Sequence, residues 1–275
     1  MKFKLIILII AVLSINTGCE KKMERIFDEN PTDRINASVS DAYSALQANK
    51  DGWLIKYFPS SNREFGGYTL FAKFTSATDV VMEGERNTSI ASSMFTVYPG
   101  AGPILTFDIY NPVIHYYCLP ASNGYLNIGA KESGMKGDFE FLVTKASSDS
   151  IVMEGRKSYN RIVMVPIKSS EVSTIVSSHR AAVAKFHPLG NYKFEVGTES
   201  IPATFATAAT KRALLIAGNT TPYSYRYTPT GLDFYTEYDV KGIKFRELKY
   251  VEPTGAYTKG YFINDAGTIK LVPQS

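Results

Sequence analysis

The sequence predicts a mostly β (α+β) protein in which antiparallel sheets, arranged as meanders, are covered by two helices. Its 275 residues include 18 Tyr and 16 Phe, residue types that suit a pleated and half-buried surface. Short segments with a hydrophobic period of two recur along the chain and are separated by Gly, Pro and Asn. Two stretches, 31–52 and 170–186, instead carry apolar residues at helical spacing, which predicts one helix in each.

The clearest strand signals lie in the middle of the chain. Apolar and polar residues alternate in GPILTFDIY (102–110) and again in GDFEFLV (137–143). The alternation predicts that one set of side chains points into the core of a sheet: Leu105, Phe107, Ile109, Phe139, Phe141 and Val143. The segment 150–167, SIVMEGRKSYNRIVMVPI, reads as a hairpin with its loop near Gly155.

The N-terminus has the features of a secretory signal peptide. Lys2 and Lys4 precede an apolar run over 5–13, which is shorter than the roughly 20 residues of a membrane-spanning helix. We therefore expect residues 1–18 to be removed from the mature protein.

Cys19 is the residue on which we expect a lipid anchor. Two small residues, Thr17 and Gly18, stand directly before it, as a lipoprotein signal peptidase requires, although Asn16 occupies the position where the usual motif has leucine. Several acyl chains on one residue would give stable membrane anchoring. The expected location is the outer membrane. The charges of residues 20–24 are mixed in sign and do not indicate whether the protein faces the periplasm or the cell surface. Ordinary secretion with an unmodified cysteine is the alternative.

Composition excludes some classes of function. The formal charge of +4 falls to +2 once Lys2 and Lys4 are removed, and the chain has no basic block, so we expect no binding to nucleic acid. If Cys19 is acylated, Cys118 has no partner for a disulfide, and its apolar neighbours predict a buried, inert thiol. No cluster of metal-ligand residues is visible, and we expect neither a metal nor a cofactor.

Composition and periodicity divide the chain into five segments. Two pairs of segments are similar in sequence, 79–84 with 149–155 and 95–115 with 225–245. The second pair suggests that the C-terminal β unit is a partial repeat packed on the N-terminal domain. Independent convergence of similar hairpins is the alternative. The segments are a signal peptide (1–18), a tether (19–30), an N-terminal β-rich domain with a leading helix (31–168), a connecting helix (169–190) and a C-terminal β unit (191–275).

Catalytic motifs are missing from the sequence, so we expect a protein that is not an enzyme. His179 falls on the apolar face of the second helix, where a core histidine is the simplest interpretation. Glu83 and Glu154 each stand beside a glycine, and a pair of such carboxylates held close together could hydrolyse glycosides. A hydrolase built on them is the alternative.

Aromatic side chains are the better candidates for a binding site. Exposed flat rings stack on sugars and apolar ligands, and tyrosine adds a polar hydroxyl group. The same residues could instead fill the core, which is the expected role of the single tryptophan after the first helix. The candidates are Trp53, Tyr57, Tyr110, His115 and Tyr116.

Several segments, taken in order, resemble a known family. ERIFDENPTDRI, DGWLIKYFP, GGYTLFAKF, GPILTFDIYNPVIH and GDFEFLV are similar to the Bacteroidota lipoproteins grouped as domain of unknown function 4302. The resemblance is densest over 24–167. It implies a lipid-anchored envelope protein encoded beside outer-membrane uptake components, and it transfers only Cys19 as a functional residue.

These observations lead to one expected function. The chain would be a lipid-anchored protein of the cell envelope that binds a glycan or a peptide as an accessory to nutrient uptake across the outer membrane. A structural subunit of a surface complex is a further alternative, which an exposed apolar patch of several hundred Å² would favour.

Overall fold

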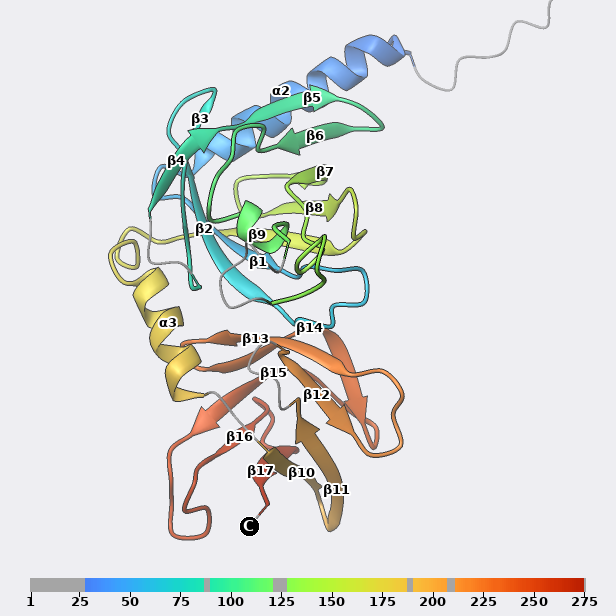
Figure 1. The fold of residues 1–275 in the computed structure, drawn as a ribbon, viewed down its shortest axis with the longest axis vertical. Helices are drawn as coiled ribbons and strands as arrows, with labels where there is room; N and C mark the ends of the chain where they lie inside the picture. The colour runs from blue at the N-terminus through green and yellow to red at the C-terminus, as the bar shows by residue number, and fades with distance from the viewer. Residues whose placement is uncertain (1–27, 87–89, 121–127, 187–189, 207–210, 275) are drawn as a thin grey trace, which may run out of the picture. The chain divides into compact units, whose positions relative to one another are not determined.

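The computed structural model describes residues 28–86, 90–120, 128–186, 190–206 and 211–274. The described residues from Ile35 onward belong to one compact unit. The fold is mostly β, with two antiparallel sheets and two α-helices among the described residues, as the sequence predicted (Figure 1). Cys19 and the expected signal peptide lie outside the described residues. No helix in the described part of the chain is long and apolar enough to cross a membrane.

Helix α2 (Pro31–Ala48) begins one residue after Asn30, whose side-chain oxygen accepts a hydrogen bond from the Thr32 amide at 3.1 Å. Asn30 is therefore the cap, with Pro31 in the first helical position, where its missing N–H costs nothing. The buried face of the helix consists of Ala42, Ala45 and Leu46, which belong to the core of the first sheet.

The first sheet contains nine strands within the described residues, in the order β4-β3-β2-β1-β9-β8-β7-β6-β5. Its edge strands β4 and β5 are consecutive in the chain and are separated only by Phe95, so the sheet is nearly closed. The strands are β1 (Trp53–Tyr57), β2 (Tyr68–Phe74), β3 (Asp79–Gly84), β4 (Ala91–Met94), β5 (Thr96–Pro99), β6 (Pro103–Thr106), β7 (Glu140–Ala146), β8 (Ile151–Gly155) and β9 (Arg161–Pro166).

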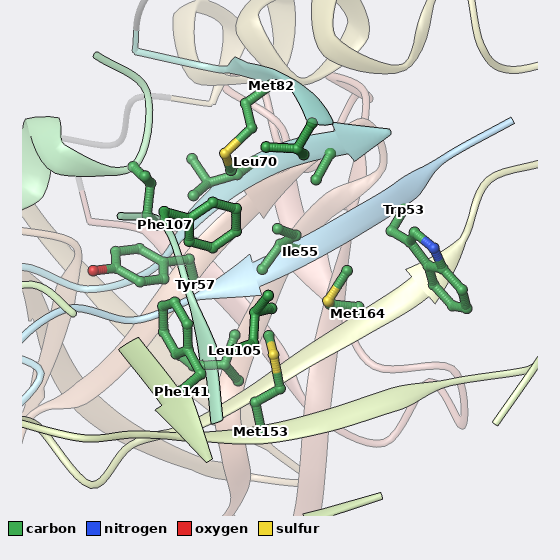
Figure 2. Packing of buried hydrophobic residues seen from close by; sticks show 14 of the residues in the cluster. Trp53, Ile55, Tyr57, Leu70, Met82, Leu105, Phe107, Phe141, Met153 and Met164 are labelled. Atoms are coloured by element: carbon green, nitrogen blue, oxygen red, sulfur yellow. The ribbon is translucent and has the colours of Figure 1, made fainter. Parts of the chain in front are cut away.

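The core of this sheet is built from alternate residues of neighbouring strands, which point to the same face. Trp53, Ile55 and Tyr57 of β1 lie among Leu70, Met82, Leu105, Phe141, Met153 and Met164 (Figure 2). Each fully buried side chain of this size stabilises the fold by about 1.5–3 kcal/mol. Phe141 and Val143 are buried as predicted, but Phe139 and Ile109 are exposed, because β7 begins at Glu140 and β6 ends at Thr106.

The second sheet is a closed antiparallel barrel in which β17 pairs with β10 as well as with β16. Its interior is packed with aromatic rings; Tyr225, Phe234 and Phe245, for example, lie within 5.3–6.0 Å of a neighbouring ring centroid. The strands are β10 (Gly190–Val196), β11 (Glu199–Phe205), β12 (Ala213–Ile216), β13 (Tyr223–Thr228), β14 (Gly231–Val240), β15 (Ile243–Val251), β16 (Tyr261–Ile263) and β17 (Lys270–Pro273).

Helix α3 (Ile175–Lys185) packs against β13 and β2 and begins later than the 170–186 stretch suggested. His179 lies on its buried face, as predicted, and its Nδ1 is 2.7 Å from the Ile175 carbonyl oxygen. Arg180 reaches the first sheet, where it pairs with Glu83 at 3.0 Å and donates to the Gly84 carbonyl at 2.8 Å.

Buried ion pairs join the barrel to the first sheet. Arg212 pairs with Glu85 and donates to the Gly67 carbonyl at 2.7 Å, while its guanidinium lies 4.3 Å from the centre of the Tyr68 ring. Asp233 of β14 is almost fully buried and accepts from Arg226 at 2.7 Å and from Lys56 of β1 at 2.9 Å.

The predicted duplication and the five-segment division stay predictions. Both 95–115 and 225–245 contain a hairpin, β5–β6 and β13–β14. The tyrosine that precedes the turn is 36% exposed in the first hairpin (Tyr98), however, whereas in the second (Tyr227) it is buried inside the barrel.

Candidate functional site

A single segment of chain after β6 spans the gap between the two edge strands of the nine-stranded sheet. Asp108 accepts hydrogen bonds from Thr96 of β5 at 2.7 Å and from Thr106 at 3.1 Å. Three residues later, the side-chain Nδ2 of Asn111 donates to the Ser93 hydroxyl of β4 at 2.9 Å. We call this crossing, residues 107–117, the seam.

Asn111 holds the seam in place. Its side chain is fully buried, and its Oδ1 accepts from the Val113 amide at 2.9 Å, which closes a local turn. The His115 amide donates to the Asn111 carbonyl at 3.0 Å, and the 3₁₀ turn His115–Tyr117 follows. The His115 ring is fixed as well, because the Asn111 backbone amide donates a hydrogen bond to its Nδ1 at 3.1 Å.

Three aromatic rings lie in a row on the seam. The Tyr110 and His115 ring centroids are 5.5 Å apart, and the His115 and Phe139 centroids are 4.9 Å apart with planes only 25° from parallel. Tyr110 is 57% exposed and Phe139 38% exposed. Phe139 reaches the row because its carbonyl accepts from the Phe107 amide at 3.1 Å, one step beyond the β6–β7 pairing. We call Tyr110, His115 and Phe139 the seam platform.

The seam platform offers flat faces and few charges. Burial lowers the pKa of His115, and its hydrogen bond to Asn111 only partly offsets that effect, so the imidazole is neutral at pH 7. Ile109, which is 49% exposed, adds apolar surface beside it. Exposed rings with a neutral imidazole and a phenol can stack on the apolar face of a sugar and hydrogen-bond to its hydroxyl groups.

The structure brings together two of the five predicted binding residues and separates the other three from the surface. Tyr110 and His115 meet in the seam platform, whereas Tyr116 is 9% exposed. Trp53 and Tyr57 have no exposed surface; Trp53 donates to the Leu46 carbonyl at 2.8 Å and Tyr57 to the Asp138 carbonyl at 2.9 Å. These two rings fill the core in this conformation.

Phe139 is the platform residue that sequence analysis missed. In GDFEFLV it stands two residues before Phe141 and four before Val143, so the alternation of a strand places all three on the same face, in the core. The signal that could have found it is the Gly137-Asp138 pair directly before it, since turn residues end an alternating pattern.

Other candidate chemistry is not assembled in the described residues. Glu83 of β3 and Glu154 of β8 are separated in the sheet by β2, β1 and β9, and Glu83 pairs with Arg180. Burial raises the pKa of Cys118 to about 12, so its thiol is protonated and a poor nucleophile. No group of three or more His, Cys, Asp or Glu in the described chain could hold a metal ion.

Comparison with family models gives one match, to Domain of unknown function (DUF4302), over residues 23–252. The match covers well over half of the chain. The chain belongs to this family. The DUF4302 match contains the whole seam platform and ends just after β15, which leaves β16 and β17 outside it. Searches of curated proteins and of solved structures returned no match.

Proposed function

We propose that this chain is a lipid-anchored envelope protein of a Bacteroidota cell that binds a glycan at the seam platform, as an accessory to nutrient uptake across the outer membrane. The observation that supports it most is the row of Tyr110, His115 and Phe139 rings, two of them well exposed. An exposed aromatic row costs free energy in water unless a ligand covers it.

A glycan fits this surface better than a peptide. The ring row presents flat exposed faces, and a pyranose presents a flat C–H face together with hydroxyl groups. Two carboxylates close to the rings in sequence are already engaged within the chain: Asp108 accepts two threonine hydroxyls, and Asp138 accepts the amides of Lys157 and Ser158. The platform is held by the buried Asn111, so little ordering entropy is lost on binding.

The proposed anchor is a lipid on Cys19, outside the described residues. Residues 20–30 would then link the lipid to α2, and eleven residues reach at most about 40 Å when fully extended. Such a tether lets the folded part stay close to the membrane without being embedded in it.

Binding is tested with the full chain purified in detergent and applied to an array of neutral glycans, acidic glycans and peptides. We expect binding to glycans, with dissociation constants in the micromolar to millimolar range that is typical of open sites. Binding to peptides alone, or turnover of a bound glycan, would replace the proposal with peptide capture or with hydrolysis.

The anchor is tested separately by mass spectrometry of the protein isolated from the native cell. We expect the mature chain to begin at an acylated Cys19, and a Cys19→Ser variant to leave the membrane fraction. An intact, unmodified thiol at Cys19 in mature material would contradict the anchor and would leave glycan binding to stand on its own test.

A further inference from the structure

A second cluster of charged and aromatic side chains lies on the barrel, partly outside the region 23–252 that the family model matches. Lys270 of β17 is partly buried, and its ammonium group lies over two tyrosine rings, 5.1 Å from the Tyr257 centroid and 5.5 Å from the Tyr261 centroid. Its nearest oxygen partner is the Tyr257 hydroxyl at 3.5 Å, the limit for a hydrogen bond.

Lys270 differs from other lysines of the barrel. Lys241 pairs with Glu199 at 2.8 Å and Lys249 pairs with Asp265 at 2.7 Å, both on exposed surface. Among the described residues, no carboxylate lies within ion-pair distance of Lys270. Its direct partners are a tyrosine hydroxyl group and two ring faces, and the Glu195 carboxylate attracts it only from a longer distance.

The neighbouring carboxylate is already occupied. Glu195 of β10 lies directly across the ladder from Lys270, but one of its oxygens accepts from Lys193 at 3.1 Å and the other from the Tyr257 hydroxyl at 2.8 Å. Although burial alone raises the pKa of Glu195, these two hydrogen bonds and the nearby lysines lower it overall, so it is ionised at neutral pH. The cluster of Lys193, Glu195 and Lys270 therefore carries one net positive charge.

The loop that carries Tyr257 is held by its own backbone. The amides of Thr254 and Tyr257 each donate to the other's carbonyl at 3.0 Å, and the Gly260 amide donates to the Tyr257 carbonyl at 3.0 Å. Gly260 has φ +73, and a Cβ there would come within 2.3 Å of the Tyr250 hydroxyl. The tyrosine rings are thus presented by a defined loop that needs glycine at this position.

Two surface pockets flank the cluster. One of about 210 Å³ is lined by Ala256–Gly260, Pro273 and Gln274. The other, of about 220 Å³, is lined by Glu195, Gly197, Gly267, Thr268 and Lys270. Tyr257 lines the first pocket and its hydroxyl donates to Glu195, which lines the second, at 2.8 Å, so the two pockets are adjacent. An elongated ligand could occupy both pockets while it passes over the tyrosine rings.

We infer that this cluster is a binding site for an acidic oligosaccharide. A carboxylate of the ligand would pair with Lys270 and Lys193, and a sugar ring would stack on Tyr257 and Tyr261. The aromatic faces favour a sugar, and the net positive charge of the cluster favours a negative charge on that sugar. The inference uses no residue of the seam platform and does not depend on the function proposed for it.

Calorimetric titration of the full chain with a tetrasaccharide of galacturonate tests the site, with a neutral tetrasaccharide of glucose as the comparison ligand. We expect the uronate to bind and its affinity to fall as salt rises from 50 to 500 mM, because the contact is between exposed charges. Lys270→Gln should weaken binding about tenfold, the usual loss of one charge-assisted contact, and Lys270→Arg should retain most of it.

Matched controls separate this site from the seam platform. Lys249→Gln removes a lysine from the same barrel and should leave the affinity unchanged, as should Tyr110→Ala on the first sheet. Lys193→Gln changes a residue of β10, outside the loop that carries Tyr257. It should also weaken binding, and so it tests the site even if Lys270→Gln perturbs the loop. Absence of uronate binding, uronate binding that both lysine variants leave unchanged, or equal affinity for the neutral tetrasaccharide in the Tyr110→Ala variant would each overturn the inference.

Discussion

The His115 ring lies almost parallel to the Phe139 ring, with centroids 4.9 Å apart, although the two residues are separated by 24 positions in the chain. The contact exists because the Phe107 amide donates to the Phe139 carbonyl and so extends the β6–β7 pairing by one step. A pair of rings fixed in this way needs no reorganisation before a sugar ring of the ligand stacks on the seam platform.

Truncating the exposed rings of the seam platform should abolish glycan binding while the fold stays stable. Tyr110→Ala and Phe139→Ala each remove a stacking face, and we expect at least a tenfold loss of affinity in titration calorimetry. Tyr110 is more than half exposed, so Tyr110→Ala should change the free energy of unfolding by less than about 1 kcal/mol. Phe139 is 38% exposed and stacks on His115, so Phe139→Ala should cost more, about 1–2 kcal/mol, without unfolding the chain. Tyr159→Ala, which removes a ring that is 74% exposed in another loop, is the matched control and should bind as the unmodified chain does.

The fluorescence of Trp53 should report its burial. It is the only tryptophan, it has no exposed surface, and its indole N–H is bonded to the Leu46 carbonyl. We expect a blue-shifted emission maximum that iodide does not quench, and no quenching on addition of a glycan that binds the seam platform. Direct quenching by a bound glycan would instead favour a ligand site at Trp53.

Breaking the ion pair between Glu85 and Arg212 should cost much more than breaking a surface pair. Both side chains are almost fully buried, and an uncompensated buried charge typically costs about 3–5 kcal/mol. Glu85→Gln should therefore lower the free energy of unfolding by that amount in urea denaturation. Asp265→Asn removes the carboxylate of the exposed pair with Lys249 and should cost less than about 1 kcal/mol.

The Arg212→Met variant provides a second measurement of the same pair. Combined with Glu85→Gln, it should cost clearly less than the sum of the two single losses, because neither buried charge is then left alone. Strict additivity of the two losses would show that the charges do not interact in the folded chain.

Stability should fall as the pH drops from 7 to 5. Burial lowers the pKa of His179, and the nearby positive charge of Arg226 lowers it further. A hydrogen bond to the Ile175 carbonyl and the negative charge of Glu85 raise the pKa, but they offset the decrease only in part. The unfolded chain, with a histidine pKa near 6.5, then binds more protons than the folded chain below that pH. The stabilisation is therefore fully present above pH 6.5 and is lost as the pH falls toward the folded pKa.

Urea denaturation between pH 8 and pH 5 measures this dependence. His179→Gln should flatten the slope, leaving a smaller part that comes from His115, whose pKa is also lowered by burial. A slope unchanged by His179→Gln would assign the dependence to other groups.

Cys118 should react slowly with alkylating agents in the folded chain. Burial raises its pKa to about 12, so at pH 8 the reactive thiolate is roughly a thousandfold rarer than for an ordinary cysteine. In a Cys19→Ser background, mass spectrometry should find Cys118 unmodified by iodoacetamide before denaturation and fully modified after it. Rapid modification of the folded chain would contradict the burial.

The sequence by itself determined the class of the fold and the position of most of its elements. The alternation in 137–143 and 150–167 correctly indicated β7, β8 and β9, and helical spacing indicated α2 and α3, because local hydrophobic period reflects which side of an element is buried. For the candidate site, the sequence identified Tyr110 and His115 but could not pair them with Phe139.

Only the tertiary structure decided which aromatic rings are exposed and which surfaces they form. Trp53 and Phe139 look alike in a sequence, since each stands beside a turn next to a strand, yet one fills the core and the other faces solvent. The difference arises from pairing between distant segments: α2 covers β1, whereas β6 ends early and leaves the chain after it to cross to β4. Closure of the barrel by β10 and β17 likewise brings Glu195 opposite Lys270, 75 positions away. Local periodicity carries no information about such long-range partners, because burial of a side chain depends on what is packed against it.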